Sequence, residues 1–177
     1  MQVLTPGGRA PDFELVDITG QPVRLSQVLE VASVAVVLDF WSVECSWSTE
    51  YDEWFAEVSE DWVGDGIVFL AIASNSNETF PMIAAAAKER KLGFPILHDK
   101  GAVVADMYGA LTTPHIFVVD ANGFLAYSGA IDDRTLDSPQ ATVNYLESAL
   151  DALIRRHRPE PATTEPFGCV LVRTEVD

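Results

Sequence analysis

Two long apolar runs dominate the first half of the chain. They cover residues 34–41 and 67–73, are rich in valine, isoleucine and leucine, and do not alternate with polar residues. Strands that are buried on both faces of a parallel sheet have this pattern. We therefore expect both runs to be strands of a buried sheet.

Helical periodicity follows each of these runs. After Cys45, aromatic and apolar residues recur every three or four positions from 47 to 62, with acidic residues between them, and the Gly64–Gly66 segment ends the pattern. This predicts one helix that begins directly after Cys45. Further helices are predicted at 78–91, where Pro81 fits only the first turn, at 102–108 and from 139 to 157.

The remaining segments have the alternation and turn residues of short strands. Two of them, at 13–17 and 23–25, surround the turn 19–22 and predict an N-terminal β-hairpin, and a short strand follows at 94–98. A second hairpin joins 116–119 to 124–128 through Asp120–Gly123. Strands that alternate with helices, followed by a hairpin and a last helix, predict an α/β fold with a mixed sheet flanked by helices.

Length and composition favour one folded domain. The chain has 177 residues, of which 48% are hydrophobic, enough for one ordinary core. We assign residues 1–158 to this domain. Residues 159–177 form a separate extended tail, because its first part is rich in proline and cannot continue a helix, and this tail carries Cys169.

Charge and cysteine content limit the partners and the compartment. With 27 acidic and 11 basic residues, the formal charge is −16, which argues against nucleic acid and anionic membranes as partners. The sequence has no basic and apolar leader pattern and no run long enough to cross a bilayer, so we expect a cytoplasmic protein. Two cysteines and three histidines without close spacing predict neither a disulfide framework nor a metal site, and no cofactor is implied.

Cys45 is the main candidate for chemistry. It lies where a central strand is expected to end and a helix to begin, and the free N–H groups of a first helical turn favour a thiolate over a thiol. The alternative is a structural cysteine, since free cysteines are among the most buried residues.

Several motifs around this cysteine resemble the thioredoxin fold. Leu38-Asp39-Phe40-Trp41-Ser42 up to Cys45 resembles the strand before the thioredoxin nucleophile, and Thr113-Pro114 resembles the loop whose cis-proline lies beside it. Gly7-x-x-Ala10-Pro11-Asp12-Phe13 resembles the redoxin branch that contains the alkyl hydroperoxide reductase and thiol-specific antioxidant proteins. The stretch 129–134 and the tail ending Phe167-Gly168-Cys169 look like a bacterial peroxiredoxin-like group within it. The resemblance implies a thiol oxidoreductase with antioxidant or disulfide-exchange chemistry.

The chain departs from thioredoxins in having Ser48 where they have a second cysteine. Ser48 cannot form a disulfide but could donate a hydrogen bond to the Cys45 thiolate. The resemblance makes Asp39 a candidate proton relay, and the alternative is a buried acid satisfied by the backbone or water. Trp47, Thr113 and Pro114 are candidate substrate contacts.

The chain also departs from the peroxiredoxin pattern. Ser42 matches the serine or threonine of the peroxide loop, so it is a candidate substrate contact, but Leu38 replaces the proline and Pro114 stands near the expected arginine. Cys169 is either a resolving cysteine or a packing residue. Eleven residues from Arg158 can extend about 36 Å, which is enough to reach Cys45.

These observations lead to a thiol oxidoreductase that uses Cys45 as its nucleophile on a thiol or disulfide of a protein or small molecule. The alternatives are a thiol peroxidase with a non-standard peroxide site and a redox-inactive binding module. A homodimer is a further possibility. We interpret His98, His115 and the segment Asp132-Asp133-Arg134 as surface or loop residues without a catalytic role.

Overall fold

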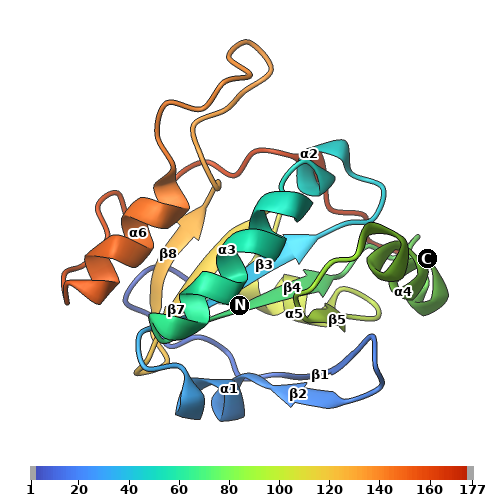
Figure 1. Ribbon diagram of the computed structural model, residues 1–177, viewed down its shortest axis with the longest axis horizontal. Helices are drawn as coiled ribbons and strands as arrows, with labels where there is room; N and C mark the ends of the chain where they lie inside the picture. Colours follow the sequence, from blue (N-terminus) through green and yellow to red (C-terminus); the bar gives the residue numbers. More distant parts are fainter. Residues whose placement is uncertain (1–2, 175–177) are drawn as a thin grey trace.

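A seven-stranded mixed sheet forms the centre of the computed structural model, which describes residues 3–174 (Figure 1). The strand order is β2-β1-β5-β4-β3-β7-β8. The strands are β1 (Glu14–Asp17), β2 (Pro22–Arg24), β3 (Ala35–Trp41), β4 (Ile67–Ala73), β5 (Ile96–His98), β7 (Ile116–Asp120) and β8 (Leu125–Gly129). Neighbours β3, β4 and β5 are parallel, and the other pairs are antiparallel. The expected mixed sheet, with its N-terminal hairpin β1–β2, is confirmed.

Residues 3–174 also contain six helices: α1 (Leu25–Val31), α2 (Ser46–Thr49), α3 (Asp52–Gly64), α4 (Phe80–Arg90), α5 (Val103–Tyr108) and α6 (Tyr145–Ile154). The core is divided into two clusters of buried residues. One contains residues of α3, α4 and α6, and the other contains residues of α1 and α5. All seven residues of β3 are buried, because this strand lies between the two layers. No helix within residues 3–174 is long and apolar enough to cross a membrane.

The predicted helix after Cys45 is interrupted at Glu50 and Tyr51. The Tyr51 N–H bonds to the Ser48 carbonyl, three residues back (3.2 Å), so α2 ends in a tight turn before α3 begins. The helix α1 was not predicted from the sequence. Its N-terminus is capped from a distance, because the Asp12 carboxylate accepts the Ser26 N–H (2.9 Å).

The last helix begins later than the sequence pattern predicts. Asp133 accepts the backbone N–H groups of Thr142 (2.7 Å) and Val143 (3.1 Å), which keeps this segment outside the helix. Asn144 then caps α6 by accepting the Glu147 N–H (2.9 Å). The expectation of a helix from residue 139 is therefore wrong at its N-terminal end.

The tail is extended, but it is packed on the domain and does not stand free as an arm. Ser128 in β8 exchanges backbone hydrogen bonds with Ala162 and Thr164 (both 3.1 Å), and the Thr164 hydroxyl accepts the Ala130 N–H (2.9 Å). Further along, β9 (Cys169–Val170) pairs with β6 (Thr112–Thr113) in a second, two-stranded sheet. Figure 1 shows the tail passing from α6 along β8 towards α2 and then towards α4. The boundary at residue 158 remains a prediction.

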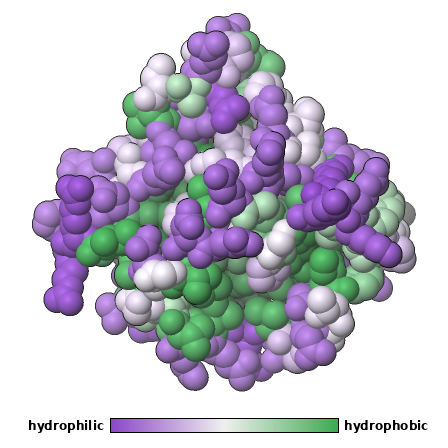
Figure 2. Space-filling view, viewed as in Figure 1, coloured by the Kyte–Doolittle hydropathy of each residue, from purple (hydrophilic) through white to green (hydrophobic). Residues whose placement is uncertain are grey.

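The surface carries both polar and apolar side chains. Figure 2 shows polar side chains spread over one face, with apolar side chains gathered towards its lower centre. Large apolar residues with high exposure include Val31 (75%) and Val63 (69%). Single exposed apolar residues are normal on a folded domain and need no special explanation.

Candidate redox site

Cys45 and Cys169 form a disulfide within one chain, although 124 residues separate them. Cys45 follows β3 as the N-cap residue of α2, as the sequence pattern predicts, and its side chain is buried (3% exposed). Cys169 lies in β9 and is half-buried. Their Cα atoms are 6.1 Å apart, within the usual range for a bridged pair. The tail therefore places Cys169 in direct contact with the candidate nucleophile.

The loop that contains Thr113 and Pro114 forms one wall of the site. The Thr113–Pro114 peptide bond is cis. Thr113 is directly opposite Cys169 in the β6–β9 ladder, and its carbonyl oxygen lies 2.9 Å from Cys45 Sγ. The Thr113 carbonyl therefore lies directly against the sulfur of the candidate nucleophile.

A buried network of hydrogen bonds, made by Ser42, Asn75 and Glu78, holds the loop that leads to Cys45. The Ser42 hydroxyl donates to Glu78 Oε1 (2.5 Å) and accepts N–H groups from Cys45 (3.2 Å), Glu44 (3.3 Å) and the Asn75 amide (3.0 Å). Ser42, Asn75 and Glu78 are all at least nine-tenths buried. Because the Ser42 proton is directed to Glu78, this hydroxyl fixes the loop and is not free to donate to a substrate.

The same network contacts the tail. Asn75 Oδ1 accepts the Val172 N–H (2.8 Å), and the Val172 carbonyl accepts the Ser76 N–H (2.9 Å). Asn75 thus joins the nucleophile loop to the chain just after Cys169. Asn75 and Glu78 were not predicted as site residues. They could have been found from the polar stretch that follows β4, because the carboxyl ends of the parallel strands β3 and β4 lie at the same sheet edge.

Ser48 and Trp47 lie on α2 beside the disulfide. Ser48 is buried, and its hydroxyl accepts the Ser42 N–H (3.2 Å), so in this disulfide form its hydrogen bond is made to the loop and not to the Cys45 sulfur. Trp47 packs edge to face against Phe167, with ring centroids 4.8 Å apart. Ser42, Ser48 and the Thr113–Pro114 loop thus contact the segments that carry the disulfide.

Asp39 is a buried acid without a hydrogen-bond partner among the described residues. Its side chain on β3 is fully buried, and neither carboxyl oxygen is bonded. Burial, with a smaller contribution from the negative charge of Asp52, raises the pKa of Asp39 well above its ordinary value. Among the described residues no backbone group satisfies this acid, whereas a role as proton relay and satisfaction by water both stay predictions. Asp52 is itself held by Trp41 Nε1 (2.7 Å) and Arg90 (3.3 Å).

His115 and Asp132 lie in loops, as expected, but both are buried, so the interpretation as surface residues is wrong for them. His115 is 5% exposed and its Nδ1 accepts the Leu111 N–H (3.1 Å), and burial lowers its pKa to about 4. Asp132 is also 5% exposed and accepts a hydrogen bond from the Tyr51 hydroxyl (2.8 Å) and two from Arg134 (3.0 and 2.9 Å). These contacts tie the loop after β8 to the junction of α2 and α3.

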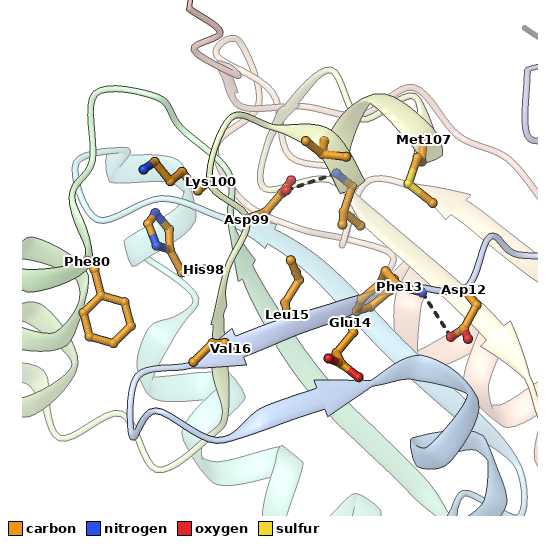
Figure 3. Close-up of a pocket in the computed structure, with 12 residues that line it drawn as sticks. Asp12, Phe13, Glu14, Leu15, Val16, Phe80, His98, Asp99, Lys100 and Met107 are labelled. Atoms are coloured by element: carbon orange, nitrogen blue, oxygen red, sulfur yellow. Dashed lines mark hydrogen bonds between the residues drawn. The ribbon is translucent and has the colours of Figure 1, made fainter.

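One cavity of the domain lies away from this site. It has a volume of about 590 Å³ and is lined by residues of β1, α5 and the segments around them, among them Leu15, His98 and Met107 (Figure 3). None of its lining residues belongs to the disulfide site. Among residues 3–174, no group of three or more histidine, cysteine or acidic side chains is arranged to hold a metal ion.

Comparison with known families identifies the domain. The family model described as AhpC/TSA family matches residues 6–128. The chain belongs to the AhpC/TSA family. The match contains Cys45, the Ser42 network and the Thr113–Pro114 loop, but it ends before the tail. Thioredoxin-fold and peroxiredoxin proteins are among the solved neighbours of this AhpC/TSA domain, which confirms the fold expected from the sequence.

Three relatives illustrate the range of this similarity. A hypothetical protein of Sinorhizobium meliloti 1021 has a crystal structure that is 30% identical, with a TM-score of 0.88, and the alignment covers 99% of this chain and 98% of that one. The thiol-disulfide oxidoreductase ResA of Bacillus thuringiensis subsp. konkukian is 26% identical over 66% of this chain and 65% of the relative. The chloroplastic peroxiredoxin Q of Sedum lineare is 30% identical over 68% of this chain and 66% of the relative. The alignment thus spans slightly less than two thirds of these two curated relatives.

Proposed function

We propose that this protein is a thiol-disulfide oxidoreductase whose redox centre is the pair Cys45 and Cys169. The observation that carries the proposal is the disulfide itself, which joins a cysteine at a strand-helix junction to a cysteine on a docked tail. The similarity to a thiol-disulfide oxidoreductase supports it. The substrates are protein or small-molecule disulfides and thiols.

The reaction consists of two exchange steps. In the reduced protein, the Cys45 thiolate attacks one sulfur of a substrate disulfide, and the other substrate sulfur leaves as a thiolate. The Cys169 thiolate then attacks Cys45 Sγ, the substrate leaves as its second thiolate, and the Cys45–Cys169 bond forms. Two electrons pass from the protein to the substrate. An external dithiol restores the reduced protein, and the reverse sequence oxidises a substrate dithiol.

Insulin reduction in the presence of excess dithiol tests this function. With excess dithiol, we expect turnover by the wild type and none by Cys45→Ser. With one equivalent of disulfide substrate and no dithiol, Cys169→Ser should form a stable mixed disulfide between substrate and Cys45, because that variant lacks the second thiol. Equal rates in the wild type and in Cys45→Ser would refute the proposal. No turnover by the wild type, with its Cys45–Cys169 bond unchanged by dithiol and by substrate, would instead favour the redox-inactive binding module.

A thiol peroxidase is the second candidate, favoured by the similarity to a peroxiredoxin. Peroxide would oxidise Cys45 to a sulfenic acid, and the Cys169 thiol would then displace water to form the same disulfide. Two features count against efficient peroxide binding. Ser42, the expected peroxide contact, donates its proton to Glu78. Arg90 reaches the loop before Cys45, where it binds the Val43 carbonyl (2.9 Å), but its guanidinium is also paired with Asp52 and is therefore already engaged. We therefore expect peroxide to oxidise Cys45 much more slowly than a peptide disulfide does, which stopped-flow fluorescence of the nearby Trp47 can measure.

Two further expectations belong to the same proposal. A disulfide within one chain needs no second copy, so we propose that the reaction cycle runs in a monomer, and the alternative homodimer can be detected by sedimentation in both redox states. We also propose the cytoplasm as the compartment, in keeping with a pair that is re-reduced between cycles. Cell fractionation tests this expectation.

A further inference from the structure

The tail occupies the position that a substrate must take to react with Cys45. Backbone pairing places Cys169 opposite Thr113 and Val170 opposite Thr112, and the Leu171 N–H bonds to the Leu111 carbonyl (3.0 Å). Any other polypeptide cysteine that bonds to Cys45 from this side has the same strand edge, Leu111 to Thr113, available for pairing. The docked tail is therefore a template for an extended peptide paired with this strand edge.

The residue before the tail cysteine has no room for a side chain. A Cβ atom at Gly168 would lie 2.2 Å from the Thr113 carbonyl oxygen and 3.0 Å from Pro114 Cδ. Both neighbours belong to the wall of the site, and the carbonyl is backbone, so the wall cannot yield by moving a flexible side chain. A segment bound in the same register is restricted to glycine at this position.

The second residue before the cysteine contacts an aromatic side chain. Phe167 meets Trp47 edge to face, with ring centroids 4.8 Å apart and an angle of 68° between the rings. The residue after the cysteine is unconstrained, because Val170 is 79% exposed. These contacts define a sequence pattern for a bound segment: an aromatic residue, glycine, cysteine and then any residue.

We propose, building on the proposed disulfide exchange, that the preferred substrates are proteins that present a disulfide-bonded cysteine in an extended segment of this pattern. Such a segment pairs with β6 in the reduced protein, and its cysteine sulfur is attacked by the Cys45 thiolate while its bonded partner sulfur leaves as a thiolate. Cys169 then attacks Cys45 Sγ. As the reduced segment leaves, the tail pairs with β6 again, so the return of the tail releases the product.

Synthetic peptides test this preference directly. Each is a six-residue peptide with the tail sequence Pro-Phe-Gly-Cys-Val-Leu or a variant of it, linked through its cysteine to thionitrobenzoate, whose release is followed by absorbance. The reduced full-length protein should react about tenfold or more faster with the glycine peptide than with a peptide that has valine before the cysteine. Replacement of the peptide phenylalanine by alanine should slow the reaction by roughly two- to tenfold. Rates with free dithiothreitol correct for intrinsic reactivity.

Variants of the protein separate the two parts of the pattern. Trp47→Ala should remove the preference for phenylalanine and keep the preference for glycine, whereas Trp47→Phe should keep both. Equal rates for all peptides, with insulin reduction intact, would overturn this inference and leave the proposed function standing. Absence of reaction with every peptide and with insulin would overturn the proposed function.

Discussion

Asp39 shows how a single buried group makes stability depend on pH. In the unfolded chain this carboxyl ionises near its ordinary pKa of about 3.9. In the folded protein, burial raises the pKa well above that value, so the native state holds the proton more tightly. The free energy of unfolding contributed by Asp39 is therefore greatest below the ordinary pKa and declines as the pH rises towards the folded pKa.

The variant Asp39→Asn should remove this decline. At pH 8, urea unfolding should give it a free energy of unfolding about 1 to 3 kcal/mol higher than that of the wild type. The difference should be smaller at pH 4. Asp61→Asn, an exposed change on α3, is the control. If the two variants have the same pH dependence, the carboxyl of Asp39 is not kept neutral by the fold.

Ser48 gives a second prediction at the residue scale. Residues three apart on a helix lie one turn from each other, so Ser48→Cys should place a thiol within reach of Cys45 and divide the disulfide between this new partner and Cys169. The matched control is Ser46→Cys, an exposed position in the same helix α2 that directly follows Cys45 in the chain. Peptide mapping under non-reducing conditions measures the division. Absence of any bond to the introduced thiol would contradict a helix start at Cys45.

At the scale of elements, the sequence predicted those parts that local patterns determine. The apolar runs of β3 and β4 and the Asp120–Gly123 turn before β8 were correct because burial and turn chemistry are visible in a few consecutive residues. The start of α6 was wrong because Asp133, nine residues earlier, binds the N–H of Thr142. The docking of the tail on β8 and β6 could not be predicted, since backbone pairing between distant segments leaves no periodic signal.

The candidate site divides in the same way. Cys45 and Thr113–Pro114 were found from local motifs and a family resemblance. The Ser42–Asn75–Glu78 network was not, because it depends on which strand ends meet and on a tail residue, Val172, that completes it. Sequence reasoning therefore reached the nucleophile but not the groups that orient it.

The pairing of β6 with β9 gives a prediction for this element. Gly168→Ala forces a methyl group against the Thr113 carbonyl, so the tail must shift and the equilibrium constant for the Cys45–Cys169 bond against a dithiol buffer should fall about tenfold. Gly93→Ala is the matched control, because no atom lies within 4 Å of its Cβ position. Equal equilibrium constants in both variants would show that β9 does not need this close approach.

The charge of the whole molecule should select among substrates. A net charge of −16 attracts cationic peptides and repels anionic ones at low salt. A peptide disulfide flanked by lysines should therefore react faster than one flanked by glutamates, and the ratio of the two second-order rate constants should fall towards one at high salt. A ratio that is independent of salt would show that the acidic surface does not act at the site.

The most direct test of the account is intact mass spectrometry of the reduced protein after reaction with one equivalent of a peptide disulfide. We predict a monomer that has lost two hydrogens for each substrate disulfide reduced, with Cys45 and Cys169 linked in the non-reducing digest, and with Cys169→Ser stopped at the mixed disulfide on Cys45. Reduction of the substrate without a bond between these two cysteines, at the same rate in the wild type and in Cys169→Ser, would contradict it.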